Sequence, residues 1–200
     1  MMKKIPYAQS HSILTHFELS PEAADVIDGN WAPIEVITQL QKQRLYLDLT
    51  AFFAHALPMR EALWWAVQSL RLRLDDLSQL ERQIIALCSD WVQQPNEPLR
   101  RKIEQMIVPL ANESAAKWLG YSVFWSGFGS IAPIDNPVVM PADFLHAKAV
   151  AGAVNTAAAL PEWQGYERYY QTVVQTALSI AHGEPAKVTV KEAACQARLE

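Results

Sequence analysis

Apolar residues in the middle of the chain recur at spacings of four, three and four positions. This spacing places apolar side chains on one face of a helix, while charged and amide side chains occupy the other face. Three successive segments carry it: Leu63, Val67, Leu70 and Leu74; Leu80, Ile84, Leu87 and Trp91; and Leu99, Ile103, Met106 and Leu110. Because such a face must be buried against a neighbour, the pattern predicts three packed amphipathic helices.

The breaks between these segments fall at residues that end and begin helices. Residues 75–78 separate the first two segments, and Ser78 can cap the second. Residues 94–98 separate the second from the third, and Asn96 can cap the third. Connections this short favour antiparallel packing of neighbouring helices.

Similar patterns predict further helices on both sides of this region. They cover about 34–45, 48–57, 114–125, 143–160 and 162–181, with Gly183 suited to the last C-terminus. The predicted fold is therefore all-α, a compact bundle of about seven to eight helices over residues 31–183. Residues 1–30 are expected to form an irregular, partly disordered N-terminal extension, although Ser20-Pro21 is a good helix start. Residues 184–200 are expected to form a mobile tail.

One long connection is unusually apolar. Between Ser126 and Pro141 the chain has three prolines and two glycines, and no helical periodicity. It also carries apolar side chains at Phe128, Ile131, Ile134, Val138, Val139 and Met140. Such a loop either packs against the core or offers a docking surface for a partner.

Composition narrows the classes of function. The chain has 200 residues, 50% of them hydrophobic and 19% charged, and a formal net charge of -4. This is a globular composition, and it disfavours a nucleic-acid-binding surface. The basic run at residues 100–102 is interpreted as a solvated helix face. No apolar stretch is long enough to cross a membrane, and we find no signal peptide. Two cysteines do not make a disulfide framework, so we expect a cytoplasmic protein.

No catalytic motif for nucleotides, hydrolysis or metal chemistry is present. Asp143 and His146 share a helix face at the i, i+3 spacing, but one such pair falls well short of a di-iron site. We therefore predict no enzyme activity, no metal and no cofactor.

The densest group of functional side chains is His55, Arg60, Glu61, Trp64 and Trp65. Glu61 could act as a general base near His55. However, Glu61 lies in a predicted first helical turn, where a carboxylate stabilises the helix without any catalytic role. A structural role is thus favoured, and a ligand-binding or enzymatic bundle with a site around His55, Arg60 and Glu61 is kept as the alternative.

Seven tryptophans are many for a chain of this length. Trp91, Trp118 and Trp125 lie on predicted helices; Trp118 and Trp125 are seven positions apart and share a face, so both are assigned to the core. Trp64 and Trp65 point about 100° apart, so one of them should face the core and the other a helix seam or a partner. Trp31 and Trp64 are the surface candidates, and tryptophan is common at interface hot spots.

Two stretches resemble a family of small bacterial proteins of unknown function. They are FAHALPMREALWWA at residues 53–66 and AKWLGYSVFWSG at residues 116–127, followed by IAP at 131–133 and AVAGAV at 149–154. The resemblance extends over about residues 35–160. Members of this family occur beside type VI secretion genes, near spike-tip proteins and effector-loading chaperones. The resemblance implies an accessory adaptor or co-chaperone, and it supplies no catalytic residues.

The sequence therefore predicts a non-catalytic interaction protein. Its partner would be a secretion chaperone, an effector, a spike-tip protein or a second copy of the chain, with no nucleic acid and no membrane involved. The predicted partner-binding residues are Arg60, Trp64, Phe128, Ile131, Ile134, Val138 and Met140.

Overall fold

The computed structural model describes residues 2–184, and this part of the chain contains helices but no strands. Eight helices have ten or more residues and two have four. They are α1 (His11–Leu14), α2 (Pro21–Ala24), α3 (Pro33–Lys42), α4 (Tyr46–Ala56), α5 (Met59–Arg71), α6 (Gln79–Gln93), α7 (Glu97–Ile107), α8 (Ala115–Phe124), α9 (Leu145–Ala158) and α10 (Tyr166–His182), with a 3-10 turn at Leu74–Asp76. The predicted all-α bundle is confirmed.

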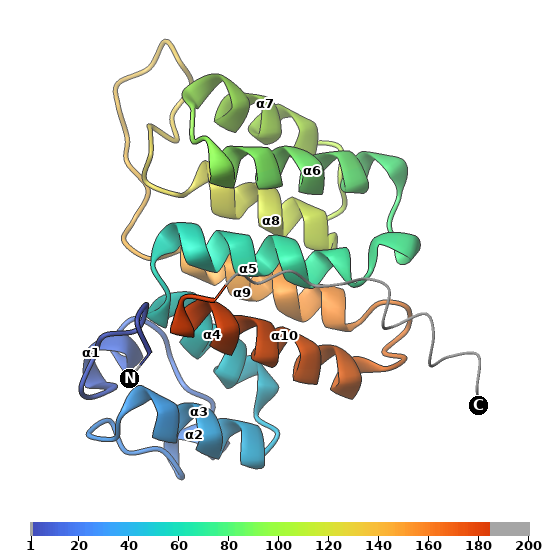
Figure 1. Ribbon diagram of the computed structural model, residues 1–200. Helices are drawn as coiled ribbons and strands as arrows, with labels where there is room; N and C mark the ends of the chain where they lie inside the picture. Colours follow the sequence, from blue (N-terminus) through green and yellow to red (C-terminus); the bar gives the residue numbers. More distant parts are fainter. Residues whose placement is uncertain (1, 185–200) are drawn as a thin grey trace.

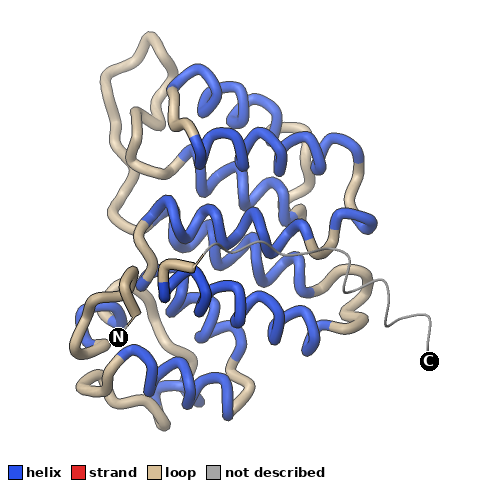
Figure 2. Tube along the Cα trace, viewed as in Figure 1, coloured by secondary structure: helices blue, strands red, loops and turns tan. Residues whose placement is uncertain are grey.

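The long helices stack in rows (Figure 1). α7, α6, α5 and α10 follow one another in the front row, and α8 and α9 lie behind them. α9 packs against α8, α4 and α5, while α8 also packs against α6 and α7. Figure 2 shows one long connection, between α8 and α9, which runs along one edge of the stack. This connection is the apolar loop singled out in the sequence.

The apolar stripes face the core as predicted. Their central residues are fully buried, among them Leu63, Val67 and Leu70 on α5, Ile84 on α6 and Ile103 on α7. Residues at the helix ends, such as Leu74 and Leu110, are half-buried. The periodicity was informative because each stripe lies against at least one other helix.

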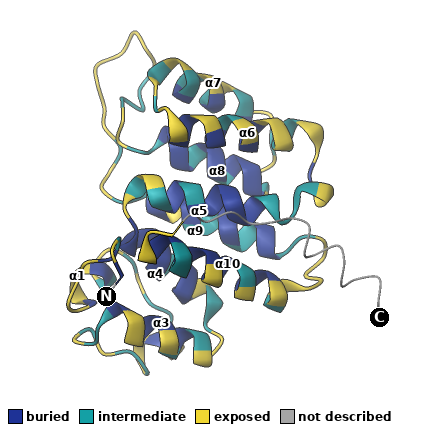
Figure 3. Cartoon of the chain, viewed as in Figure 1, coloured by how far each residue is buried: buried dark blue, intermediate teal, exposed yellow. Residues whose placement is uncertain are grey.

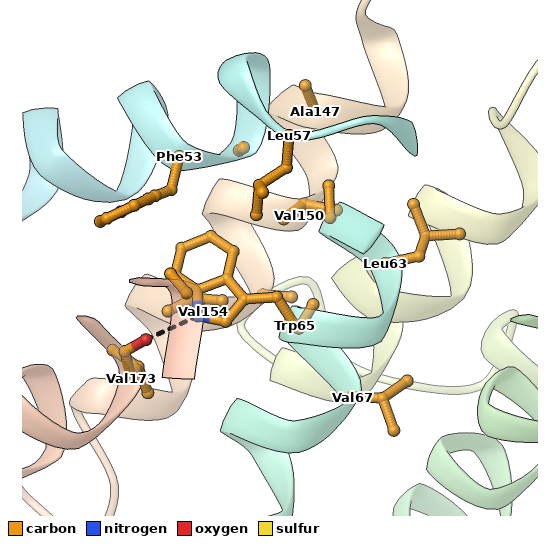
Figure 4. Packing of buried hydrophobic residues seen from close by; sticks show 14 of the residues in the cluster. Phe53, Leu57, Leu63, Trp65, Val67, Ala147, Val150, Val154 and Val173 are labelled. Carbon is orange, nitrogen blue, oxygen red and sulfur yellow. Dashed lines mark hydrogen bonds between the residues drawn. The ribbon is translucent and has the colours of Figure 1, made fainter. Parts of the chain in front are cut away.

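The centre of the core is built around Trp65 (Figure 4). Its side chain is completely buried, its ring lies 5.7 Å from that of Phe53, and its indole N–H donates to the Val173 carbonyl oxygen at 2.8 Å. This hydrogen bond joins α5 to α10 and leaves no polar atom of Trp65 unpaired. Of the two adjacent tryptophans, Trp65 thus faces the core, and Trp64 is half-buried.

Four helix starts are capped by side chains that the chain provides locally. Ser20, Ser78, Asn96 and Ser114 each accept a hydrogen bond from a backbone N–H in the first turn of α2, α6, α7 and α8. Each cap satisfies one of the amides that a helix N-terminus leaves unpaired. The predicted caps at Ser78 and Asn96 are confirmed.

Two helices begin later than the periodicity indicates. α9 starts at Leu145 because Phe144 has a φ of 57°, which a right-handed helix does not accept. α10 starts at Tyr166 because Glu162, Trp163 and Gly165 also have positive φ angles. Residues other than glycine that adopt left-handed backbone angles carry no strong sequence signal. The starts of α9 and α10 were therefore not predicted correctly.

The N-terminal region differs from the partly disordered extension expected from the sequence. Met2, Ile5 and Ile13 are buried, and the Lys4 amide donates to the Ala181 carbonyl oxygen at 2.9 Å. Ser20 donates to the Asp48 carboxylate from both its amide and its hydroxyl. Met2, Ile5 and Ile13 are isolated apolar residues without a helical period, so the sequence did not indicate that the N-terminal region packs on the bundle. The tail expected at 184–200 lies outside the described residues except for Glu184.

The two tryptophans assigned to the core, Trp118 and Trp125, are less buried than predicted. Trp91 is fully buried, whereas Trp118 and Trp125 are half-buried. Trp125 is the C-cap that follows α8 and stacks on Tyr121, with ring centroids 4.5 Å apart, at the surface where the loop begins. Within residues 2–184, no helix has the length and apolar character needed to span a membrane.

Candidate functional site

The loop between α8 and α9 carries much of the exposed apolar surface of the described chain (Figure 3). Ile134 is 81% exposed, Val138 76%, Met140 51% and Phe128 49%. Val139 is exposed as well, while Ile131 is half-buried. The part of the loop that carries these residues therefore does not pack on the core, in agreement with the predicted docking surface.

Internal hydrogen bonds close the base of this loop. The Ile131 amide donates to the Val139 carbonyl oxygen at 2.8 Å, and the Val139 amide donates to the Ser130 hydroxyl at 3.0 Å. The Phe128 ring meets Trp91 edge to face, with centroids 5.8 Å apart. These contacts hold residues 132–138 as a projecting tip with a defined shape.

Arg100 on α7 fastens the loop to the bundle. Its side chain is completely buried and donates to the carbonyl oxygens of Phe124 and Ser130, both at 2.7 Å. The same guanidinium binds both carboxylate oxygens of Glu97, at 2.6 and 2.7 Å. A buried charge is tolerated only when it is paired and hydrogen-bonded. The hydrogen bonds of Arg100 therefore favour the observed position of the loop, which places the Ser130 carbonyl oxygen within reach.

Arg101 completes the anchor from the next position. It donates to the carbonyl oxygens of Ser130 and Ala132, at 2.8 and 2.9 Å, and pairs with Glu97 and Glu104. Hydrogen bonds from Arg100, and then from Arg101, hold the pKa of Glu97 below its usual value against the opposing effect of burial. The interpretation of residues 100–102 as a solvated helix face is thus wrong for Arg100 and Arg101, because both bind carbonyl oxygens of the loop.

Gly129 permits this close approach. A Cβ atom at this position would lie 2.8 Å from the Glu97 Oε2 and 3.0 Å from the Arg100 Nη2. A side chain at this position would therefore require the ends of the Glu97 and Arg100 side chains, or the loop, to shift. Neither Arg100 nor Gly129 is among the partner-binding residues predicted from the sequence.

Two other predicted partner residues are engaged within the chain. Arg60 donates to the Val92 carbonyl oxygen through Nε and Nη2, at 3.1 and 2.6 Å, and to that of Gln93 at 3.2 Å. It thereby satisfies carbonyl groups at the C-terminus of α6. Trp64 is half-buried beneath Arg71, whose guanidinium lies 5.6 Å from the ring. Neither residue belongs to the exposed loop.

The alternative site around His55, Arg60 and Glu61 is only partly assembled. His55 lines a cleft of about 410 Å³, which the N-terminal segment and α9 also form. Arg60 is directed to α6, and Glu61 accepts a hydrogen bond from the Lys4 ammonium at 2.5 Å. Of these three predicted residues, the cleft thus receives His55 alone.

Three histidines surround Phe144 beside this cleft. The Phe144 ring stacks on His16 with centroids 3.8 Å apart, and it lies 5.8 Å from His55 and 6.3 Å from His146. Burial lowers the pKa of His55, and it lowers that of His146 to about 4, with the His55 charge contributing. Both imidazoles are therefore neutral at pH 7.

The described residues contain no group of three or more His, Cys, Asp or Glu side chains placed to hold a metal ion. Asp143, the predicted helical neighbour of His146, is exposed and precedes the first turn of α9. Cys88 is buried in the core as a free thiol, and burial raises its pKa, so it is unreactive.

A comparison with family models finds one match, described as a family of unknown function (DUF6931), over residues 36–181. No curated protein and no solved structure is detectably similar to the chain. The matched region includes α4 to α9 and the whole exposed loop, and it excludes most of the N-terminal segment.

Proposed function

The chain belongs to the family of unknown function DUF6931, and from its exposed loop we propose that it is a non-catalytic interaction protein. The contact surface is the loop tip, with Ile134, Val138 and Met140 as the main apolar contacts and Phe128 at its base. One observation carries the proposal: these side chains are exposed on a loop that a buried arginine holds in place.

An exposed apolar loop with no anchor would have to be ordered when a partner binds, and this costs free energy. Here the base is already closed by hydrogen bonds and ion pairs, so the tip is preorganised for binding. Burying large apolar side chains against a partner contributes about 25 cal/mol for each Å² removed from water. Both effects favour a role in protein association.

The biological setting that we propose is type VI secretion. The motifs at residues 53–66 and 116–127 resemble those of proteins encoded beside secretion genes. The protein would act in the cytoplasm as an adaptor or co-chaperone in effector loading. Its partner would then be an effector-loading chaperone, an effector or a spike-tip protein.

The proposal is tested by co-purification with each candidate partner from the same gene neighbourhood. The double variant Ile134→Glu/Val138→Glu places two carboxylates on the loop tip and should weaken binding at least tenfold. Leu47→Glu is the matched control, because Leu47 is 63% exposed on α4 and outside the loop. Affinities are measured by titration calorimetry on the purified pair.

Equal binding by the wild type and the loop variant would overturn the assignment of this surface. Failure of every candidate from the neighbourhood to bind would overturn the secretion setting. A loss of binding in Leu47→Glu as large as that in the loop variant would also count against the loop.

A ligand-binding function of the bundle is the second candidate, and it rests on the cleft at His55. Arg60 and Glu61 have other partners, so a general base formed by Glu61 with His55 has no geometric support. What remains is a binding site with a neutral imidazole in its wall.

A further inference from the structure

A hollow of about 270 Å³ lies where α5 ends and α10 begins, at the edge of the stack opposite the long loop (Figure 1). It contains two arginines and, among the described residues that line it, no carboxylate. We call it the arginine pocket. Its lining residues come from the end of α5 and from the first two turns of α10: Leu72, Arg73, Gly165, Arg168, Tyr169 and Thr172.

Two contacts place the guanidinium of Arg73 in the wall of this pocket. Its Cζ lies 5.0 Å from the centre of the Tyr169 ring, and its Nη2 donates to the Gln164 carbonyl oxygen at 3.2 Å. Tyr169 lines the pocket, and so does Gly165, which directly follows Gln164. The cation–π contact and the hydrogen bond therefore hold the planar group between the end of α5 and the start of α10.

Most of the hydrogen-bonding capacity of Arg73 is unused. A guanidinium can donate several hydrogen bonds, and the described residues supply one acceptor to Arg73. Its Nη1 makes no hydrogen bond with these residues and is not buried, so a ligand can meet this atom without reaching the buried Nε. Arg73 also forms no ion pair within residues 2–184, whereas Arg100 and Arg101 each pair with Glu97.

The start of α10 adds to the positive potential of the pocket. Arg168 is exposed, and the carboxylate next to it in sequence, Glu167, is directed to Arg44 at 2.8 Å. No side chain caps α10 at Gly165, so the positive end of the helix dipole is uncompensated there. No atom lies within 4 Å of the place where a Gly165 Cβ would be, so a ligand has room at this helix start. Together with Arg73, these features favour an anion.

A phosphate monoester matches both the charge and the size of the pocket. It carries a charge of about −1.5 to −2 near pH 7, and its oxygens accept the paired N–H groups of a guanidinium. An apolar cavity of roughly 150 Å³ accommodates benzene, so 270 Å³ holds a phosphate with one small group beside Leu72. We propose that the arginine pocket binds the phosphate group of a small phosphate monoester, with Arg73 as the main contact and Arg168 as the second.

The experiment compares phenyl phosphate with benzoate, which has the same ring but a carboxylate with one charge. On the full chain we expect phenyl phosphate to bind at least tenfold more tightly than benzoate by titration calorimetry. Arg73→Gln should weaken the binding of phenyl phosphate at least tenfold. Lys102→Gln is the matched control, because it removes the same charge from an exposed position on α7 and should bind as the wild type does.

A second variant covers the case in which Arg73→Gln does not fold. Arg168 is exposed, so Arg168→Gln should fold and should weaken the binding of phenyl phosphate at least threefold. In NMR spectra of the wild type, phenyl phosphate should shift the backbone amide resonances of Gly165 and Tyr169 and leave that of Lys102 in place. Equal affinities for the two probes, unchanged binding in either folded variant, or unmoved resonances at millimolar phenyl phosphate would each overturn the proposal.

A phosphorylated side chain of a partner protein would present the same chemistry. The small volume of the pocket favours a free compound, so a short phosphotyrosine peptide should bind no more tightly than phenyl phosphate. Binding of the peptide that is tighter by tenfold or more would overturn the small-molecule assignment. The loop variant Ile134→Glu/Val138→Glu should bind phenyl phosphate normally, so this proposal and the proposed function fail independently.

Discussion

The two ends of the segment between α8 and α9 differ in whether the buried polar groups beside them are hydrogen-bonded. At its first end, Arg100 is fully buried, and its hydrogen bonds reach two carbonyl oxygens and a carboxylate. At its second end, Phe144 lies among three histidines, and the Nε2 of His55 is buried without a partner. The first end is an anchor whose polar groups are paired, and the second end keeps one buried nitrogen without a partner.

The difference separates a satisfied polar network from a region that keeps an unsatisfied group. A satisfied network stabilises one arrangement of the chain. An unpaired buried acceptor such as His55 Nε2 destabilises the folded protein slightly. Between these two ends lies the exposed apolar tip, whose position the anchor determines.

The largest effect should come from removing the anchor. Arg100→Met leaves the Phe124 carbonyl oxygen buried without a partner and removes the buried charge from its pair with Glu97. We expect the free energy of unfolding to fall by about 3 kcal/mol, measured by urea denaturation. The adjacent exposed Lys102→Met is the control, with a change below about 0.5 kcal/mol. Equal changes in the two variants would contradict the anchor.

Lowering the pH should reduce the stability of the protein through the histidines around Phe144, at the second end of the segment. The folded protein keeps His146 neutral down to a pKa of about 4, whereas the unfolded chain binds the proton near pH 6.5. Stability contributed by this group is present above pH 6.5 and is lost as the pH falls toward 4. The lowered pKa of His55 acts in the same direction.

We expect the free energy of unfolding to drop by about 1 to 2 kcal/mol from pH 7 to pH 5 on account of His146. His146→Gln should lose that part of the drop, and His11→Gln should retain it. Urea titrations of the three proteins at both pH values measure the difference. An identical drop in wild type and His146→Gln would show that burial does not keep His146 neutral.

A smaller effect is expected at Gly129. In Gly129→Ala the added Cβ meets the side-chain ends of Glu97 and Arg100 at 2.8 and 3.0 Å, so these side chains or the loop base must shift. The cost should be about 1 kcal/mol, as for other overpacked sites. Gly29→Ala, where the nearest atom would lie at an ordinary 3.5 Å, should cost less. Thermal unfolding of the two variants ranks them, and the reverse order would refute the close approach.

The smallest effect on stability should be at the tip. Ile134→Glu changes a residue that is 81% exposed, so its free energy of unfolding should stay within about 0.5 kcal/mol of the wild type. Its binding to the partner should nevertheless fall. A clear loss of stability in urea would mean that Ile134 packs within the fold and is not free for docking.

The helices were predictable because their signal is local. The stripes on α5, α6 and α7 repeat within each segment, and Ser78 and Asn96 cap the helices that directly follow them. The packing of Ile5 and Ile13 was not predictable, because single apolar residues have no period. Left-handed residues such as Phe144 were missed for the same lack of a local pattern.

The candidate site was predictable only in part. The apolar loop stood out by composition, and its exposure agrees with a docking surface. Arg100 was missed because its partners, Phe124 and Ser130, lie 24 and 30 positions away and bind through backbone oxygens, which are the same in every residue type. His55 was noted from its neighbours Arg60 and Glu61, yet its surroundings in space are Phe17, Phe144 and His146.

Site-specific photo-crosslinking tests most directly whether the loop tip is the surface that meets a partner. A photoreactive phenylalanine analogue replaces Ile134 in one variant and Leu47 in another, in cells that produce the candidate chaperone, effector and spike-tip protein. The account predicts a crosslink from position 134 to one of these three proteins and none from position 47. Crosslinks from position 47 alone, or none from position 134 while a complex is purified from the same cells, would contradict it.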